Sequence, residues 1–594
     1  MLPNYQKQVK DLEHKILDLN KKDNKLSLFR LLSFLSFLAG VIWAVSSASG
    51  FSFLLPLILL FVFIAVLSEH QKTRRSIRET QTLKDLLENE ISVLHFKGNQ
   101  YNNGMAFRDP DHDFSQDMDL FGENSLFQYI NRCATGVGVK TLANILRSDH
   151  TIESILERQE MIREMATEKD WSLDMRRMLY QKRMRDFSKE FLPEIKNTIQ
   201  PPAHYRYLLF TSYLVLVLSL LSVPFLKPGG WMLLVPVFFN MILLSRTGKF
   251  IKTIKAQLEG RERILNEYRK ILSVFEKKHW HSIYLRNLQK NLSADGVSSS
   301  KIIEKLYKRS RESEYTLNML TAALLNYFFA WDLLVTIRIA GWFNQYAEKT
   351  REWFDVIGQV ESLLSLANIQ HNHNWIYPEI IQGDFCFQAT DMGHPLIPEN
   401  ERVNNSFTMK KPATTSIITG SNMAGKSTFL RTIGANIILA HAGAPVCASQ
   451  FKISIFRIMT YLTITDSLSE NTSTFYREIK RLKKLLDSSK KDHNVLLLLD
   501  ELLRGTNSAD KARGSIAITR ELVENEIPSV IATHNLELAD MQKQYQQHIR
   551  NYYFDITIEN NEEMRFDYKL KEGICNTFNA SILLKEIGIN IDME

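Results

Sequence analysis

The chain has little cysteine for its length. Its four cysteines, Cys133, Cys386, Cys447 and Cys575, lie far apart in 594 residues and form no C-x-x-C pair. This spacing argues against a disulfide framework or a structural zinc site and is typical of a reducing compartment. Hydrophobic residues make up 45% and charged residues 23% of the sequence, which excludes bulk disorder and predicts several folded units.

Charged side chains are also missing from two long stretches. Residues 31–68 contain none, and they divide into apolar runs at about 31–46 and 51–67, separated by SSASG. Residues 207–245 contain only Lys227, in a turn between runs at about 207–226 and 230–245. Because a helix needs about 20 apolar residues to cross a bilayer core, each stretch predicts a transmembrane hairpin. Buried core helices are the alternative.

Basic residues flank both stretches, whereas the two turns hold only Lys227. The positive-inside rule therefore predicts that both termini and all large segments lie in the cytoplasm. We expect a multi-pass protein of the cell inner (cytoplasmic) membrane without a cleaved signal peptide. The lipid bilayer is then a partner, and the net charge of +7 is weaker evidence for nucleic acid than in a protein without membrane spans.

The pattern of the remaining chain changes near residue 375. Before it, apolar residues recur at three- and four-residue spacing, which predicts amphipathic helices, including one long helix over 246–280. Residues 101–117 are rich in Asn, Asp and Gly and predict a linker. After it, the runs TTSIIT, VLLLLD and PSVIAT alternate with helical segments, which predicts an α/β domain with buried parallel strands. Two alternating strands follow in YYFDITIENNEEMRFDYKL.

The strongest motif is GSNMAGKST, which fits G-x-x-x-x-G-K-[ST] between a predicted strand and a predicted helix. Backbone amides at the helix N-terminus can hold phosphate, Lys426 can reach the outer phosphates, and the Ser427 hydroxyl can ligate Mg²⁺. The sequence thus predicts binding of ATP with Mg²⁺. The expected binding residues are Gly420, Ser421, Asn422, Met423, Ala424, Gly425, Lys426, Ser427 and Thr428.

Two further strands end in residues suited to hydrolysis. VLLLLDE ends in Asp500, which can hold the metal with Ser427, and Glu501, which can orient or deprotonate the attacking water. SVIATHN ends in His534, which can hydrogen-bond the γ-phosphate or that water. Glu501, His534 and Lys426 are the expected catalytic residues of an ATPase.

These motifs resemble those of the MutS mismatch-repair ATPases, a branch of the ABC-type ATPases. The family's TGPNMGGKST, DEIGRGT and ATH correspond here to TGSNMAGKST, DELLRGT and ATH, and STFYREI matches a further family element. The resemblance implies a P-loop (ABC-type) ATPase domain over 376–594 that works as a head-to-tail homodimer. Ser473 would approach the γ-phosphate held by the other subunit, with a simple helix cap as the alternative. Arg402 and Val403 lie near the position of the family's adenine contact.

The resemblance also suggests a division of the helical part. Residues 1–100 carry the first hairpin, 101–205 and 247–375 resemble the family's helical core and levers, and 206–246 form the second hairpin. The family's mismatch-reading domain has no counterpart. We expect the second hairpin to replace part or all of the DNA clamp, with residues 185–206 and 246–290 as levers.

Three functions remain open. The first is a membrane-anchored ATPase coupled to DNA or structured DNA, and the second is an ATP-driven membrane switch that does not use DNA. The third is an ABC-type transporter, but the sequence LSENTSTF stands where a transporter has LSGGQ. Family resemblance favours DNA by analogy alone.

Overall fold

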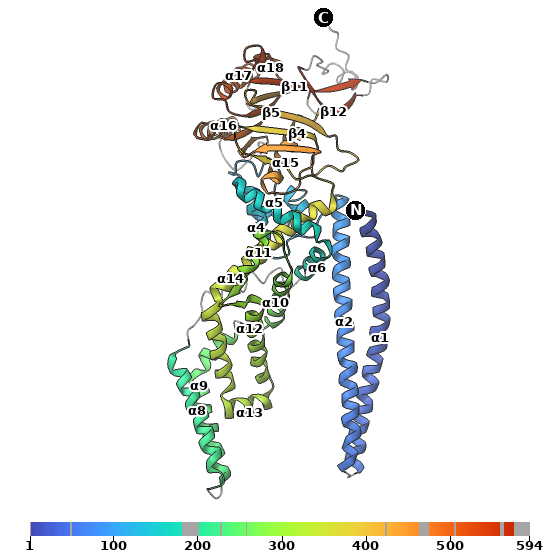
Figure 1. Cartoon of the computed structure of the whole chain (residues 1–594), viewed down its shortest axis with the longest axis vertical. Coiled ribbons are helices and arrows are strands. Elements are labelled where there is room, and N and C mark those ends of the chain that lie inside the picture. Colours follow the sequence, from blue (N-terminus) through green and yellow to red (C-terminus); the bar gives the residue numbers. More distant parts are fainter. Residues whose placement is uncertain are drawn as a thin grey trace. The chain divides into compact units, whose positions relative to one another are not determined.

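The computed structural model describes residues 2–47, 50–180, 201–225, 229–256, 258–421, 424–462, 474–492, 494–503, 507–558 and 564–574. These residues form two compact units. Unit 1 contains Met1–Ile130, Leu146–Leu156 and Asn368–Glu594, and unit 2 contains Asn131–Ile145 and Glu157–Ala367. The described part is mostly helical before residue 375 and α/β after it, as the sequence predicts (Figure 1).

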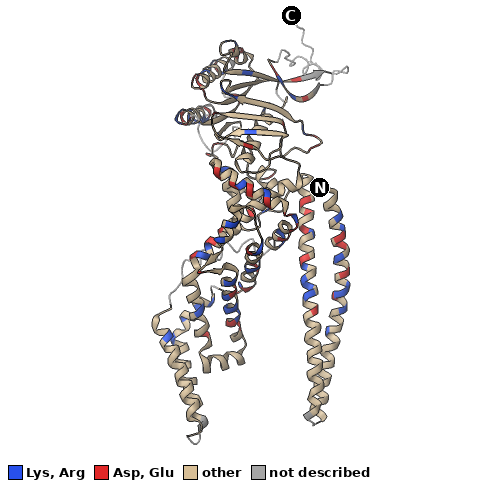
Figure 2. Cartoon of the chain, in the orientation of Figure 1, with Lys and Arg blue, Asp and Glu red and all other residues tan. Residues whose placement is uncertain are grey.

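Unit 1 begins with two long helices, α1 (Leu2–Ser47) and α2 (Leu54–Leu94), which pack side by side as an antiparallel pair (Figure 1). The apolar runs form the halves next to the connection, where Figure 2 shows no charge. The other halves are polar and are joined by ion pairs, including Lys22–Glu69 at 2.8 Å and Lys84–Glu13 at 2.9 Å. Both helices are long and apolar enough to cross a membrane by length and composition.

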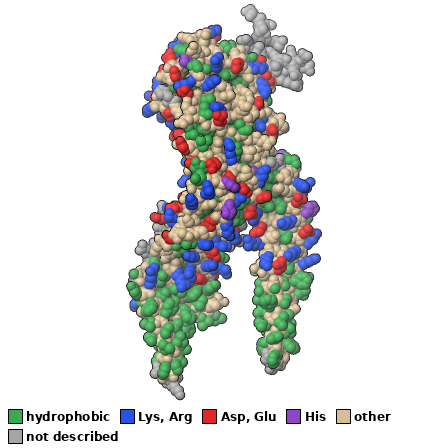
Figure 3. All heavy atoms as spheres, viewed as in Figure 1, with side chains coloured by type: hydrophobic (Ala, Val, Ile, Leu, Met, Phe, Trp, Pro, Cys, Tyr) green, Lys and Arg blue, Asp and Glu red, His purple; other side chains and the backbone are tan. Residues whose placement is uncertain are grey.

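In its described residues, unit 2 is helical apart from a short hairpin of β1 (Ser293–Ala294) and β2 (Val297–Ser298). Its helices are α4 (Gly136–Arg147), α5 (Ile152–Thr167), α6 (Lys169–Leu179), α8 (Ala203–Ser222), α9 (Leu234–Ala256), α10 (Glu262–Lys277), α11 (Ile283–Lys290), α12 (Ser299–Glu314), α13 (Met319–Phe329) and α14 (Trp331–Asn372); α4, α5 and α14 also reach unit 1. α8 and α9 are the other two helices that are long and apolar enough to span a membrane. Figure 3 shows hydrophobic side chains gathered over their surface.

The prediction of one long helix over 246–280 is wrong. α9 ends at Ala256, and a turn leads to α10, which begins at Glu262. Gly260 lies in this turn with φ of +71°, a left-handed conformation that glycine adopts without a Cβ clash. The amphipathic pattern continues across the break, which is why periodicity alone does not reveal it.

The C-terminal part of unit 1 contains a six-stranded sheet in the order β12-β11-β6-β10-β9-β8. Its strands are β6 (Thr415–Thr419), β8 (Arg457–Tyr461), β9 (Val495–Asp500), β10 (Ser529–Thr533), β11 (Ile549–Ile558) and β12 (Met564–Glu572). All neighbours are parallel except β11 and β12. This confirms the buried parallel strands and the final antiparallel pair. A smaller sheet, in the order β3-β7-β4-β5, was not predicted; its strands are β3 (Glu379–Ile381), β4 (Cys386–Met392), β5 (Asn405–Lys410) and β7 (Gln450–Ser454).

Helices cover both faces of the larger sheet. On one face, Leu497 and Leu499 share a core with Leu482 of α16 (Thr474–Lys491) and Leu522 of α17 (Ser508–Glu524). On the other face α15 (Lys426–His441) packs against β9 and β10. The helix α18 (Leu536–Asp540) follows β10, and α3 (Leu126–Ile130) lies earlier in the unit. Parallel strands buried on both faces explain the continuous apolar runs.

Candidate nucleotide-binding site

The phosphate-loop motif connects β6 to α15. Gly420 has φ of +149°, and a Cβ there would lie 2.9 Å from the backbone oxygen of Phe554. Gly425 has φ of +99° and directly precedes the first residue of α15. Both positions therefore require glycine. The loop brings the amide-rich N-terminus of α15 to the end of the sheet, which is the arrangement that binds phosphate. Asn422 and Met423 lie outside the described residues.

The predicted phosphate and metal residues meet at this point. Lys426 is buried, and its Nζ donates to the backbone oxygens of Gly420 and Ser421, at 2.8 Å each. Ser427 Oγ donates to Asp500 Oδ2 at 2.6 Å, and Asp500 is the buried last residue of β9. Lys426 is thus hydrogen-bonded to the backbone of its own loop. The Ser427 hydroxyl and the Asp500 carboxylate are hydrogen-bonded to each other next to it.

Strand register places Glu501 and His534 next to this group. β10 lies between β6 and β9, pairing Thr533 with Thr419 and Ala532 with Asp500. The residues that follow these strands therefore share one edge of the sheet. Glu501 Oε1 lies 3.5 Å from His534 Nδ1.

Glu501 is held in an unusual conformation. Its φ is +48°, a backbone conformation that non-glycine residues rarely adopt. Residues in such conformations cluster at functional sites. Its amide donates to the backbone oxygen of Ala532 at 3.0 Å, and its Oε2 lies 3.9 Å from Lys511 Nζ. The side chain is 18% exposed and lines the cavity described next. The carboxylate thus lies beside His534 and Lys511, and it lines the same cavity as Lys426 and Ser427.

A cavity of about 510 Å³ opens beside the phosphate loop. Lys426, Ser427 and Glu501 form one wall, and the segment around Arg402 and Val403, with Tyr568 of β12, forms another. Arg402 and Val403, expected near an adenine contact, therefore do line this cavity.

Tyr568 is a lining residue that sequence reasoning missed. Its side chain lies beside Gly425, where an added Cβ would meet the ring at 3.1 Å. The Asn405 side chain fixes the strand around it by donating to Tyr568 O at 3.0 Å and accepting from Leu570 N at 2.9 Å. The alternation in RFDYKL predicts a strand but gives neither its sheet position nor which aromatic faces the loop.

His394, from the sequence GHPLIP, also lines the cavity. Burial disfavours its charged form and the nearby Arg431 and Arg402 repel it, which lowers the pKa of His394 to about 4. Its Nδ1 accepts from the amide of Leu396 at 3.1 Å. A neutral imidazole therefore faces the cavity at neutral pH.

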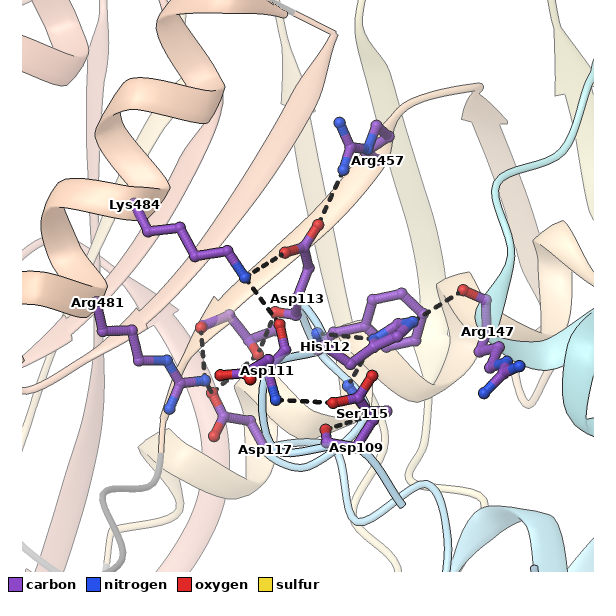
Figure 4. Close-up of polar contacts among 12 residues, drawn as sticks. Asp109, Asp111, His112, Asp113, Ser115, Asp117, Arg147, Arg457, Arg481 and Lys484 are labelled. Atoms are coloured by element: carbon purple, nitrogen blue, oxygen red, sulfur yellow. Dashed lines mark hydrogen bonds and ion pairs between the residues drawn. The ribbon is translucent and has the colours of Figure 1, made fainter. Parts of the chain in front are cut away.

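The helix that follows Ser473 is fixed by a network of charged residues. Ser473 itself lies outside the described residues, and α16 begins at Thr474. Asp117 is fully buried and accepts from Arg481 of α16 at 2.6 Å, from Thr460 Oγ1 at 2.9 Å and from Leu462 N at 3.0 Å. Figure 4 shows Asp117 and Arg481 pointing toward each other within this network.

A second acidic residue of the same segment extends the network. Asp113 pairs with Arg457 at 2.9 Å and with Lys484 at 3.5 Å, and both basic side chains reach it in Figure 4. Residues 109–117, expected to belong to a linker, are therefore bonded to β8 and α16.

The C-terminal part of the chain is similar to known proteins. Residues 416–584 match the family model of MutS domain V. The chain is 31% identical over 237 residues to a "DNA mismatch repair protein MutS" of Persephonella marina, covering 39% of this chain and 27% of that protein. It is 32% identical over 223 residues to the protein of the same name in Aquifex pyrophilus, covering 37% and 25%.

A human protein is similar over the same region. The chain is 30% identical over 245 residues to "MutS protein homolog 4" of Homo sapiens, covering 39% of this chain and 25% of that protein. The fold defines an α/β domain in which a glycine-containing loop connects β6 to α15. The C-terminal part of the chain is thus similar to domain V of the MutS family. It spans about a quarter of the length of these relatives.

Proposed function

We propose that this chain is a membrane-anchored ATPase of the MutS type. The observation that carries the proposal is the convergence of Lys426, Ser427, Asp500 and Glu501 at one sheet edge, beside a cavity of about 510 Å³. The loop and α15 would bind the phosphates, and the Tyr568 ring would offer a flat face to the adenine. Lys426 would leave the loop carbonyls and pair with the outer phosphates.

The residues at the metal position fit Mg²⁺. This ion takes oxygen ligands and is commonly held by one or two protein groups together with substrate phosphates. Ser427 Oγ and Asp500 Oδ2 are such oxygens, already 2.6 Å apart. In the described part of the chain, no group of three or more His, Cys, Asp or Glu forms a separate metal site. When bound, Mg²⁺ would neutralise charge on the phosphates.

Hydrolysis requires a base that does not bind the metal. In the proposed step, water attacks the γ-phosphorus, the bond to the bridging oxygen breaks, and Glu501 accepts the water's proton. His534, 3.5 Å from Glu501, would orient the water or the γ-phosphate. We propose that the site is completed in a homodimer, in which Ser473 of a second copy approaches the γ-phosphate.

Two variants test the enzyme. Lys426→Ala should abolish ATP binding, measured by filter binding of labelled ATP. Glu501→Gln should retain ATP but hydrolyse it about 10²–10⁴ times more slowly, the usual contribution of a general base, and should accumulate as a dimer on size exclusion in detergent. The matched control is Glu537→Gln, an exposed carboxylate just after His534. Normal turnover by Glu501→Gln would exclude Glu501 as the base.

The membrane assignment rests on α1, α2, α8 and α9, which are long and apolar enough to span a bilayer. We propose that they anchor the chain in the inner membrane with the ATPase domain in the cytoplasm. The full chain should then remain in the membrane fraction after alkaline carbonate washing. Release into the wash without detergent would contradict the anchor.

We further propose that ATP turnover is coupled to DNA, because similar proteins carry mismatch-repair names. An ATP-driven membrane switch without DNA is the second candidate, since the apolar hairpin α8–α9 lies where a DNA clamp is expected. The test is the ATPase rate in detergent with duplex, mismatched or branched DNA across salt concentrations. If coupling is specific, the ATPase rate should differ between the DNA forms. If the attraction is only electrostatic, the effect of DNA on the rate should disappear as the salt concentration rises. No response to any DNA would favour the switch.

A further inference from the structure

The helix α13 in unit 2 presents a large apolar surface. It contains no charged side chain and buries none of its own residues. Met319 is 88% exposed, Leu320 77% and Leu324 61%, and the preceding Leu317 is 83% exposed. Figure 2 shows the helix free of charge, crossing between α12 and α14. Contiguous apolar surface of this kind marks a binding face.

A chain of hydrogen bonds fastens α13 to the proposed membrane hairpin. Ser212 of α8 donates to Asn240 Oδ1 of α9 at 2.6 Å, and Asn240 Nδ2 donates to the backbone oxygen of Tyr327 at 2.9 Å. Ser212 and Asn240 are fully buried. Tyr327 lies in the last turn of α13, where carbonyls lack helical partners. Polar residues on apolar helices commonly join neighbouring helices in this way.

Both ends of α13 are capped within the protein. The Asn318 side chain accepts from the amides of Leu320 and Thr321 at the N-terminus. At the C-terminus Ala330 adopts a left-handed conformation, and its amide donates to Asn326 O at 2.9 Å. Because hydrocarbon offers no hydrogen bonds, a segment inside a bilayer needs such capping.

Charged and polar groups mark where the apolar surface ends. Lys255 of α9 donates to Asp332 at 2.6 Å and to Thr316 at 3.1 Å, so it joins the segments before and after α13. Asn326 Nδ2 also donates to Asp332, at 3.1 Å. Lys255 follows Lys249 and Lys252 on the same helix. Basic residues at the end of an apolar helix are typical of the membrane surface.

We propose that α13 is a third lipid-embedded element of unit 2, seated in the bilayer against α8 and α9. The occupant of its apolar face is lipid, because the face is continuous with the exposed apolar surface of α9 through the Asn240 contact and is bounded by basic residues. α13 has 11 residues and is bent by 80° from α14, so by itself it is shorter than a crossing helix, and we propose that it enters the bilayer as a short turn. This inference rests on the proposed membrane anchoring.

The test places a fluorescent label on α13 in the full chain. Cys386 and Cys575 are replaced by serine, while Cys133 and Cys447 remain because they are buried. Leu320→Cys and Leu324→Cys are labelled separately with a polarity-sensitive dye and reconstituted into phosphatidylcholine vesicles with or without brominated acyl chains. The unsubstituted parent measures background labelling. Phe210→Cys on α8, 68% exposed, and Tyr476→Cys on α16, 62% exposed, are the lipid and water controls.

Labels on α13 should emit at the blue-shifted wavelength of the Phe210 label and be quenched by brominated lipid to a similar extent. Emission like that of the Tyr476 label, with normal quenching at Phe210, would overturn the inference and leave the membrane anchor standing. Blue-shifted but unquenched emission would mean that protein, such as a second copy, covers α13, and would equally overturn it. Loss of quenching at Phe210 itself would refute the anchor.

Discussion

Replacement of Asp117 by alanine tests the contact that joins α16 to the segment before α3. Asp117 is fully buried and accepts three hydrogen bonds, from Arg481, Thr460 and Leu462. The Arg481 bond joins opposite charges, and the side chain of Arg481 is only 28% exposed. We expect Asp117→Ala to loosen α16 more than any surface substitution on that helix.

The magnitude follows from the three bonds. All three bonds go to Oδ2 of the Asp117 carboxylate, so each is charge-assisted. Because they share one acceptor oxygen, their contributions do not simply add. We expect a loss of about 3–5 kcal/mol, the usual cost of leaving one member of a buried ion pair alone. Arg481→Met, which keeps an apolar stem, should cost a similar amount because it strands the Asp117 carboxylate. The double variant should cost less than the sum.

Hydrogen–deuterium exchange of α16 in the detergent-solubilised chain measures this loss. Since 1.4 kcal/mol corresponds to a factor of ten, Asp117→Ala should speed exchange of α16 amides by about 10² or more. Lys484→Ala on the same helix is the matched control. Its partner Asp113 lies 3.5 Å away and the lysine is 54% exposed, so its loss should cost less than about 1 kcal/mol.

Three outcomes would refute the reasoning. Equal exchange rates in Asp117→Ala and Lys484→Ala would show that burial of the carboxylate adds nothing to the stability of α16. Additive effects of Asp117→Ala and Arg481→Met would show that the two side chains do not interact energetically. Faster exchange throughout unit 1, rather than in α16 and β8, would show a general loss of folding.

Further predictions concern the cavity and unit 2. Gly420→Ala should abolish ATP binding because its Cβ would lie 2.9 Å from Phe554 O, whereas Gly341→Ala, a helical position with open space around it, should leave binding unchanged. Tyr568→Ala should weaken ATP binding about 5–150-fold at equilibrium, which corresponds to the value of about 1–3 kcal/mol for base stacking, and Tyr568→Phe should restore it. Burial raises the pKa of Glu361 from 4.5 to about 7, so the folded state retains a proton that the unfolded state releases. The free energy of unfolding of the wild type should therefore fall by up to about 3 kcal/mol between pH 4.5 and 7 and stay constant above pH 7. Glu361→Gln should not show this decrease in thermal unfolding.

The apolar runs in the sequence predicted the site residues that lie at the ends of strands. Asp500, Glu501 and His534 each follow an uninterrupted apolar run, and such runs form parallel strands whose carboxyl ends share one edge. The structure places them there. The apolar runs of α1, α2, α8 and α9 were equally visible because the absence of charge over a long stretch is a composition signal, independent of tertiary contacts.

The rest depends on contacts between distant segments. Tyr568 lies beside the phosphate loop because β12 pairs with β11 at the sheet edge and because Asn405, more than 160 positions earlier, bonds Tyr568 O and Leu570 N. Asp117 looks like one of several acids in a polar segment, yet it is buried because Arg481 and Thr460 surround it. The partners that make burial of these side chains favourable lie far away in the sequence. The local sequence pattern therefore does not distinguish either residue from a solvent-exposed neighbour. The same reason hides α13, whose short apolar run is shorter than a membrane span and is recognisable only beside Asn240.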